Sequence, residues 1–360
     1  MPHLLDVTML WGHASGGVRR YIQAKQDWFR DSTSWRHTIV APGAQGEGAL
    51  SIGGCPIPFS GGYRAPLNRR RGARTLETQR PDLIEAADPY RLAWSSLDAA
   101  RRLNIPVVGF CHSNVEAMAR RWGGPLGSWA ARRYARRLYS QFDLVLAPSQ
   151  SMCAQVGDWG IPRVVHQPLG VDTELFHPRR RDNQWRKQCG LDARSRVLIY
   201  AGRFGAEKNL QVLADAVRKL GPPYVLVALG AGPCPPKGEQ VRLLPFTNDS
   251  HQLARALASS DVFIHAGDQE TFGLAALEAM ACGRPVIARQ RGGLGELVKE
   301  EVGMTVEQGT PSAFADAIEV LFSTPLAHRS HAARALALTH RWPMAMARLF
   351  AQYQTLLEHP

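Results

Sequence analysis

The sequence of 360 residues has no apolar run close to the roughly 18 residues that a membrane-spanning helix needs. It has no recognisable secretory signal either, because no basic region precedes the apolar stretch within its first ten residues. Its six cysteines lie at least 36 residues apart, which excludes the C-x-x-C spacing of common zinc and redox sites. We therefore expect a cytoplasmic protein that holds no metal.

The composition is that of a folded protein with an uneven charge. Hydrophobic residues make up 45% of the chain and charged residues 21%, which excludes wholesale disorder. The net charge is +12, and residues 1–180 hold 23 Lys and Arg against 14 Asp and Glu, whereas residues 181–360 hold 20 against 17. The first half should therefore attract anionic partners, such as phosphates, anionic lipid headgroups or nucleic acid.

Strand-sized apolar runs alternate with helical patterns along the whole chain. In the first half, strands are expected at residues 4–10, 37–41, 82–86, 106–110 and 144–147, and helices at 18–29, 91–103, 126–139 and 151–159. In the second half, strands are expected at 196–200, 224–229, 241–244, 261–265 and 285–288, and helices at 210–220, 250–259, 273–281, 311–322 and 345–357. This alternation predicts two α/β domains, each with a Rossmann-like parallel sheet, facing each other across a cleft. Residues 43–74 show no period and are expected to be irregular.

Two turns carry groups suited to an anion. The first is Gly12-His-Ala-Ser-Gly16-Gly17, between the first strand and the first helix, where glycines allow close backbone approach and a helix start offers free N–H groups. The second follows the first strand of the second half and places Arg203 and Lys208 five residues apart. An arginine offers a planar fork of donors and a lysine offers a mobile point charge, and both suit phosphate oxygens.

The most specific motif runs from Asp268 to Ile287. A loop with Glu270 leads into a helix that begins near Gly273, where N–H groups and the helix dipole favour a phosphate. Glu278 follows two turns later, and a strand and the segment Gly292-Gly-Leu-Gly-Glu296 come after it.

These motifs together resemble a retaining glycosyltransferase of the GT-B group, family GT4. The resemblance rests on the E-x7-E pair, the G-R-x(4)-K segment, the early Gly-Gly turn and the segment Gly170-Val-Asp172-x-x-x-Phe176-x-Pro178. It implies an acceptor-binding domain over residues 1–178 and a nucleotide-sugar domain over 179–342. It also implies that a C-terminal helix within residues 343–360 packs back on the first domain, and that no metal or other cofactor is required.

The resemblance also implies a role for each matching residue. Glu270, Arg203, Lys208 and His112 would be catalytic, with the two cations neutralising the donor diphosphate. The residues that would bind the donor are Gly16, Gly17, Phe246, Thr271, Phe272, Gly273, Leu274 and Glu278. By the residues alone, His112 and Phe246 are as readily structural. UDP- and GDP-sugars both remain open as donors.

A basic helix in the first half suggests where the acceptor binds. Its arginines, with Trp and Tyr beside them, favour an anionic membrane surface, and the alternative is a solvated helix face. The residues assigned to the membrane and the acceptor are Arg120, Arg121, Arg132, Arg133, Arg136 and Arg137. No motif for nucleic acid accompanies them. We therefore expect transfer of a hexosyl unit to a cell-envelope glycolipid or glycan, on the inner face of the plasma membrane.

Two other functions fit parts of this pattern. A sugar-nucleotide 2-epimerase shares the fold, but the Gly-Gly turn and the Glu270 motif favour a transferase. A catalytically silent module that binds a sugar nucleotide or a membrane would be expected to have lost one of Arg203, Lys208, Glu270 or Glu278, and all four are present.

Overall fold

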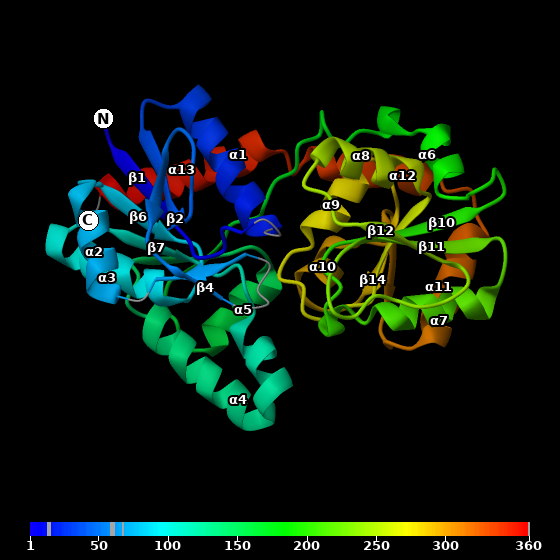
Figure 1. The fold of residues 1–360 in the computed structure, drawn as a ribbon, viewed down its shortest axis with the longest axis horizontal. Coiled ribbons are helices and arrows are strands. Elements are labelled where there is room, and N and C mark those ends of the chain that lie inside the picture. Colours follow the sequence, from blue (N-terminus) through cyan, green and yellow to red (C-terminus); the bar gives the residue numbers. More distant parts are fainter. Residues whose placement is uncertain (13–15, 58–61, 67, 359–360) are drawn as a thin grey trace. The chain divides into compact units, whose positions relative to one another are not determined.

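The computed structural model describes residues 1–12, 16–57, 62–66 and 68–358, and the chain divides into two compact units (Figure 1). Unit 1 comprises Met1–Leu169 and Trp342–Pro360, and unit 2 comprises Gly170–Arg341. The sequence places the corresponding divisions after residues 178 and 342, so residues 170–178 belong to unit 2 in the structure.

Unit 1 is built on a parallel sheet of seven strands in the order β3-β2-β1-β6-β7-β8-β9. Strands such as β7 (VVGF) and β8 (LVLA) are buried along their whole length, as expected for a sheet covered on both faces. The bounds are β1 His3–Val7, β2 Arg36–Pro42, β3 Ala49–Ile52, β6 Leu83–Ala86, β7 Val107–Phe110, β8 Leu144–Ala147 and β9 Val164–His166. A separate antiparallel pair consists of β4 (Cys55–Pro56) and β5 (Arg64–Ala65).

The helices of unit 1 are α1 Gly17–Ser32, α2 Arg69–Thr78, α3 Arg91–Leu103, α4 Val115–Tyr139, α5 Gln150–Asp158 and α13 Trp342–Glu358. The C-terminal helix α13 packs against α1: the ring of Phe350 contacts those of Trp28, Phe29 and Trp35 at centroid distances between 4.9 and 5.6 Å. This confirms the predicted return of the last helix to the first domain.

A buried ion-pair cluster also fastens α13 to the sheet. The ammonium of Lys25 on α1 lies 2.9 Å from Asp6 on β1 and 2.6 Å from Glu85 on β6, and all three side chains are fully buried. The hydroxyl of Tyr353 on α13 accepts a hydrogen bond from Lys25 and donates one to Glu85. Removing one member of such a cluster leaves an uncompensated buried charge, so these residues constrain where α13 docks.

Helix α4 is a hairpin of two helical segments rather than one rod. Gly124 has left-handed φ of 55°, and Pro125 follows it, so the chain turns there. The second segment packs on the first so closely that a Cβ atom on Gly127 would lie 2.5 Å from the carbonyl oxygen of Ala119. We call residues 115–139 the α4 hairpin. The sequence predicts only the second segment, because the Gly-Gly-Pro turn obscures the first.

Glu116 ties the α4 hairpin to the body of unit 1. Its carboxylate accepts hydrogen bonds from Ser128 and Arg132 of the second segment, each at 2.8 Å, and from the indole N–H of Trp159 at 2.7 Å. Burial alone would raise the pKa of Glu116, but these hydrogen bonds outweigh burial and lower the pKa to about 2. The hairpin therefore depends on an ionised Glu116.

Unit 2 contains a second parallel sheet, of six strands in the order β12-β11-β10-β13-β14-β15. Its strands are β10 Arg196–Ala201, β11 Tyr224–Gly230, β12 Val241–Pro245, β13 Val262–His265, β14 Val286–Arg289 and β15 Gly303–Val306. Its helices are α6 Asn183–Gln188, α7 Leu210–Leu220, α8 Ser250–Ser259, α9 Leu274–Ala281, α10 Gly292–Leu297, α11 Pro311–Phe322 and α12 Ala327–Leu338, with short 3₁₀ helices η1 Pro178–Arg180 and η2 Ala206–Lys208.

The direction of strand order reverses at one point in each sheet: between β1 and β6 in unit 1 and between β10 and β13 in unit 2. Open α/β sheets bind ligands beyond the carboxyl ends of the strands at such a reversal. Both units thus have the predicted Rossmann-like topology. In each unit, ligand-binding residues are expected beyond the carboxyl ends of the strands at the reversal.

The expectation that residues 43–74 are irregular is wrong in part. Strand β3 adds to the edge of the first sheet, and α2 begins at Arg69 with Asn68 accepting a hydrogen bond from the N–H of Arg71 at its start. The sequence hides α2 because its buried face consists only of Gly72, Ala73 and Leu76, between arginines. No helix within the described residues is both long enough and apolar enough to cross a bilayer.

The α4 hairpin provides a test of the Glu116 contacts. Hydrogen bonds to a charged group contribute about 1.5–3 kcal/mol each, so Glu116→Gln should lower amide-exchange protection of residues 115–139 at pH 7 by roughly tenfold or more. Because the pKa of Glu116 in the folded protein lies below its ordinary value of 4.5, its contribution is complete above that value and is lost as the pH falls towards 2. Hydrogen exchange between pH 7 and 3, corrected for intrinsic rates, measures both effects.

The matched control is Asp31→Asn, which removes an exposed ion-paired carboxylate from α1. Equal protection of the hairpin in Glu116→Gln and Asp31→Asn would contradict the assigned role.

Candidate functional site

The candidate site in unit 2 lies where β10 and β13 end. The turn after β10 carries Arg203 and leads through η2 to Lys208, and the loop after β13 carries Glu270 and leads to α9. Asn209, in the left-handed conformation at φ 50°, donates a side-chain hydrogen bond of 3.3 Å to the carbonyl of Ala266 and so joins the two turns. The two segments that the sequence singled out therefore converge at the reversal point of the sheet.

Lys208 and Glu270 form an ion pair at the centre of this site. The ammonium of Lys208 donates to the Glu270 carboxylate, and both side chains are only about one-fifth exposed, at 19% and 21%. His265 lies on the other side of the same carboxylate, with its Nε2 3.2 Å from Oε1 of Glu270. The N–H of Gly267 donates to Nδ1 of His265 at 3.1 Å, so Nε2 carries the proton and faces Glu270.

These two donors set the charge of Glu270. Burial alone would raise its pKa, but the charge of Lys208 and the hydrogen bond from His265 outweigh burial and hold the pKa well below its ordinary value. Glu270 is therefore ionised at neutral pH. Sequence reasoning missed His265. Its position as the last residue of a buried strand could have identified it, because ligands bind at the carboxyl ends of such strands.

Arg203 is the exposed member of the site. Its side chain is 65% exposed and its guanidinium donates to Glu207, four residues along the chain. The hydroxyl of Tyr200 donates to the backbone carbonyl of Arg203 at 2.8 Å. Burial, and secondarily the charges of Glu270 and Glu207, raises the pKa of Tyr200. Tyr200 is a second residue that the sequence did not single out.

Both cations are thus paired with carboxylates of the same unit. An incoming dianion can replace either carboxylate. It then accepts hydrogen bonds from Arg203 and Lys208, which both lie beyond the carboxyl end of β10. The pair Lys208–Glu270 is the better shielded of the two, so an anion that engages it also meets less water.

The loop between Glu270 and α9 packs against two glycines, Gly292 and Gly293, at the start of α10. The N–H of Gly293 donates to the carbonyl of Glu270 at 2.9 Å, and a Cβ atom on Gly293 would lie 2.1 Å from the carbonyl oxygen of Thr271. Gly292, with φ 62°, is also in close contact with this loop, since its Cβ would lie 2.5 Å from the Glu270 carbonyl oxygen. The Gly292-Gly293 segment therefore supports the backbone of the site.

At the start of α9, Gly273 occupies the N-cap position with φ of 100°. Its carbonyl accepts the first helical hydrogen bond, from Leu277, so the N–H groups at this end have no partner within the helix. Thr271 is half-buried, whereas Phe272 and Leu274 are buried and belong to the hydrophobic core around α9.

Two further residues are predicted to bind the donor, Glu278 and Phe246. Glu278 is buried, 2% exposed, in the middle of α9. Phe246 directly follows β12 and is 39% exposed, so it is not the buried core aromatic that was the alternative for this position.

In unit 1, the predicted residues near the first turn lie at the start of α1 and the end of β7. Gly16 is the N-cap residue and Gly17 the first residue of α1, whereas the preceding residues 13–15 of the predicted turn lie outside the described residues. The ring of His112 stacks on Phe110 with centroids 3.8 Å apart and meets the edge of Tyr21 at 4.9 Å. Burial, and secondarily the charge of Lys25, lowers the pKa of His112 to about 3, so its ring is neutral at physiological pH.

The six predicted arginines all lie on the α4 hairpin. Arg120 and Arg121 are exposed in its first segment, and the other four are exposed in its second segment. Among them, Arg132 forms an ion pair with Glu116 of the first segment. Large apolar side chains are exposed on the same hairpin: Trp122 is 90% exposed, Leu126 73%, Trp129 60% and Met118 48%. Within the described residues, no group of three His, Cys, Asp or Glu side chains is placed to hold a metal ion.

Comparisons with known proteins identify the family of the chain. Residues 15–175 match the family Glycosyltransferase Family 4, and residues 181–336 match the family Glycosyl transferases group 1. The chain is 31% identical to the GDP-mannose-dependent alpha-(1-6)-phosphatidylinositol dimannoside mannosyltransferase of Mycobacterium tuberculosis, over 97% of this chain and 95% of that protein. It is 34% identical to a GDP-mannose-dependent alpha-mannosyltransferase of Mycolicibacterium smegmatis, over 77% and 74% of the two chains.

The fold is also that of a solved structure, the sucrose-phosphate synthase of Thermosynechococcus elongatus. The TM-score is 0.83 over the full length of both chains, at 18% identity. Two Rossmann-like units of this kind define the GT-B class of glycosyltransferases.

The protein belongs to the group 1 glycosyltransferases, family GT4, as the resemblance of its motifs indicated. It is a hexosyltransferase that uses a nucleoside-diphosphate sugar.

The Lys208–Glu270 pair leads to a test that separates binding from transfer. In Glu270→Gln, Lys208 no longer has to leave a carboxylate, so a nucleoside diphosphate should bind at least as tightly as to the wild type. Transfer should fall by about 10²–10³-fold, because the resemblance implies that this carboxylate is catalytic. Calorimetric titration and initial rates on the same preparation measure the two effects, with Glu300→Gln as the control at an exposed carboxylate of unit 2. Full transfer activity in Glu270→Gln would exclude this residue from the site.

Proposed function

We propose that the protein is a GDP-mannose-dependent α-mannosyltransferase that acts on a phosphatidylinositol mannoside or a related anionic glycolipid. The observation that carries this proposal is the likeness, over nearly the whole of both chains, to the mycobacterial phosphatidylinositol dimannoside mannosyltransferase. The intact Arg203, Lys208 and Glu270 constellation supports it, since a silent relative would not need it. The relatives named above are transferases, which favours transfer over the epimerase alternative.

In this proposal unit 2 holds the donor. Lys208 and Arg203 exchange Glu270 and Glu207 for the oxygens of the donor diphosphate. Glu270 then accepts hydrogen bonds from hydroxyls of the sugar, and the N–H groups at residues 273 and 274 bind phosphate or sugar oxygens. Glu278 holds the ribose hydroxyls and Phe246 contacts the base, for which its exposed position after β12 is suitable.

Transfer with retention needs no protein nucleophile. The acceptor hydroxyl oxygen forms a bond to C1 of the sugar on the face that the diphosphate leaves, while the bond from C1 to the diphosphate oxygen breaks. The hydroxyl proton passes to the departing diphosphate, whose developing negative charge Arg203 and Lys208 stabilise. Gly16 and Gly17 allow close backbone approach to a phosphate, and neutral His112 offers a hydrogen-bonding nitrogen to the sugar.

Unit 1 provides the contact with the membrane in this proposal. The α4 hairpin combines exposed Trp122, Leu126 and Trp129 with arginines at positions 120, 121 and 133. Aromatic side chains suit the headgroup region of a bilayer, and each arginine near an anionic surface contributes about 1 kcal/mol. The protein thus binds peripherally to an anionic membrane that contains its acceptor.

The test is transfer of radiolabelled sugar to vesicles that contain phosphatidylinositol dimannoside. We expect incorporation from GDP-mannose at least tenfold faster than from UDP-glucose, and an α-linked mannose in the product by NMR. Vesicles of phosphatidylcholine alone and the Lys208→Ala variant serve as controls without acceptor and without donor binding. Incorporation from UDP-glucose alone would contradict the proposed donor, and incorporation only into a soluble glycan would contradict the proposed acceptor.

A further inference from the structure

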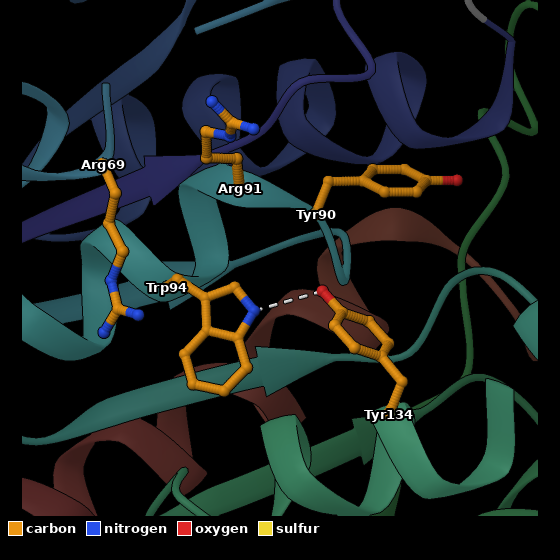
Figure 2. A pocket seen from close by; sticks show the side chains of 5 residues that line it. All are labelled: Arg69, Tyr90, Arg91, Trp94 and Tyr134. Carbon is orange, nitrogen blue, oxygen red and sulfur yellow. Dashed lines mark hydrogen bonds between the residues drawn. The ribbon is translucent and has the colours of Figure 1, made fainter. Parts of the chain in front are cut away.

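Two open pockets lie side by side in unit 1, outside the residues assigned so far to the donor. The first has a volume of about 480 Å³ and is lined by Arg69, Tyr90, Arg91, Trp94 and Tyr134 (Figure 2). The second has a volume of about 330 Å³ and is lined by Pro89, Tyr90, Val115, Met118, Ala119, Trp122, Ala131 and Tyr134. Tyr90 and Tyr134 line both pockets and form the wall between them. The first pocket has the size of a small-molecule site.

The first pocket is built from polar and aromatic groups that hold one another in place. The indole N–H of Trp94 donates to the hydroxyl of Tyr134 at 3.1 Å, as Figure 2 shows, and that hydroxyl donates to the carbonyl of Pro89 at 2.6 Å. The guanidinium of Arg69 lies 4.9 Å from the centre of the Trp94 ring and donates two hydrogen bonds to Asp98. Its aromatic wall is therefore pre-organised before any ligand arrives.

The charge around this pocket is positive. Asp98 forms an ion pair with Arg69. Arg91, the first residue of α3, lines the pocket, and the guanidinium of Arg137 lies 6.0 Å from the Trp94 ring. The nearby carboxylate of Asp88 is buried and is turned inward, where it accepts from Thr8 and from the N–H groups of Met9 and Tyr90. A pocket of this charge suits a phosphate, and the ring of Tyr134, which is 40% exposed, suits the apolar side of a sugar ring.

The second pocket differs because its lining is apolar. It lies between the two segments of the α4 hairpin and the Pro89–Tyr90 turn, and Trp122 and Met118, at 90% and 48% exposed, stand at its edge. Such a surface gains free energy by covering hydrocarbon. A polar pocket that shares a wall with an apolar one matches an amphiphile, with its headgroup in the first and its chain in the second.

The position in the fold supports a ligand site. Pro89 and Tyr90 follow β6, the strand at which the order of the first sheet reverses, so both pockets lie at its carboxyl edge. Pocket residues from α2, α3 and α4 converge on this edge, although they come from separate parts of the chain.

We propose that the two pockets form one binding site for a single molecule of the acceptor lipid. The phosphodiester and the adjoining ring of an anionic glycolipid headgroup occupy the first pocket. The first methylene groups of an acyl chain occupy the second pocket. The proposal rests on the proposed function for the identity of the lipid. It goes further because it assigns Arg91, Trp94, Tyr134 and Met118 to recognition of one lipid molecule, separately from attraction to the membrane surface.

Binding of a short-chain lipid below its micelle concentration tests the site without a membrane. The full-length protein is titrated calorimetrically with dihexanoyl phosphatidylinositol, dihexanoyl phosphatidylcholine and inositol 1-phosphate. We expect the phosphatidylinositol to bind at least tenfold more tightly than either of the other two, because only it has both an anionic headgroup and chains. Equal affinity for phosphatidylcholine would contradict the headgroup pocket. Equal affinity for inositol 1-phosphate would contradict the acyl-chain pocket.

Paired variants separate the site from general electrostatics. Arg91→Gln should weaken phosphatidylinositol binding at least tenfold, whereas Arg70→Gln removes the same charge from an exposed position outside both pockets and should change it less than twofold. Met118→Asn, at a partly exposed side chain, should weaken lipid binding but leave binding of inositol 1-phosphate unchanged. Equal losses in Arg91→Gln and Arg70→Gln would show attraction to charge alone and would overturn the proposal.

The same variants distinguish this site from the proposed function. If the wild type transfers mannose and Arg91→Gln keeps the wild-type lipid affinity and acceptor KM, the site is wrong and the function stands. If the lipid affinities follow the prediction while no mannose is transferred, the site stands and the proposed donor fails. Circular dichroism and thermal unfolding of each variant show that it is folded, independently of any nucleotide.

Discussion

The ion pair between Lys208 and Glu270 is the interaction on which the proposed donor site depends. A largely buried carboxylate is stable only when donors surround it, and here Lys208 and His265 supply them. The pair can form because β10 and β13 are neighbours at the reversal of the sheet, although 62 residues separate the two side chains. The glycines at 292 and 293 support the same loop from α10. Sheet topology, loop backbone and charge therefore bring Lys208 and Glu270 together, and this supports the proposed binding of a diphosphate by Lys208.

Unit 1 also contains carboxylates paired with cations, and there they stabilise the packing of helices. Lys25, between Asp6 and Glu85, fixes helix α13 against the sheet, and Glu116 fixes the α4 hairpin. Lys25, Asp6 and Glu85 are fully buried, so this cluster stabilises the packing of α13 and is not accessible to a ligand. The exposed arginines of the α4 hairpin, together with Trp122 and Trp129, form the surface that we propose to contact a membrane and its lipids. The positive charge of the first half of the chain thus divides into a structural part and a part that faces partners.

Much of the fold follows from the sequence, because buried parallel strands such as Val107–Phe110 and Leu144–Ala147 read as short apolar runs between helices. The motifs at Arg203, Lys208 and Glu270 could be found for the same reason: they directly follow such strands. The sequence does not reveal α2, whose buried face is small, or the first half of the α4 hairpin, which a Gly-Gly-Pro turn interrupts. It cannot show that Arg132 is neutralised by Glu116, or that His265 orients Glu270, because these contacts depend on packing between distant segments.

The central claim is that Arg203 and Lys208 exchange their internal carboxylates for the diphosphate of a GDP-sugar. The most direct measurement is a calorimetric titration, in metal-free buffer, of the wild type and the double variant Arg203→Ala/Lys208→Ala with GDP and UDP. The account predicts that GDP binds the wild type more tightly than UDP does, and that the double variant loses at least a hundredfold in GDP affinity. An unchanged affinity in the double variant, with the fold intact by circular dichroism, would contradict it.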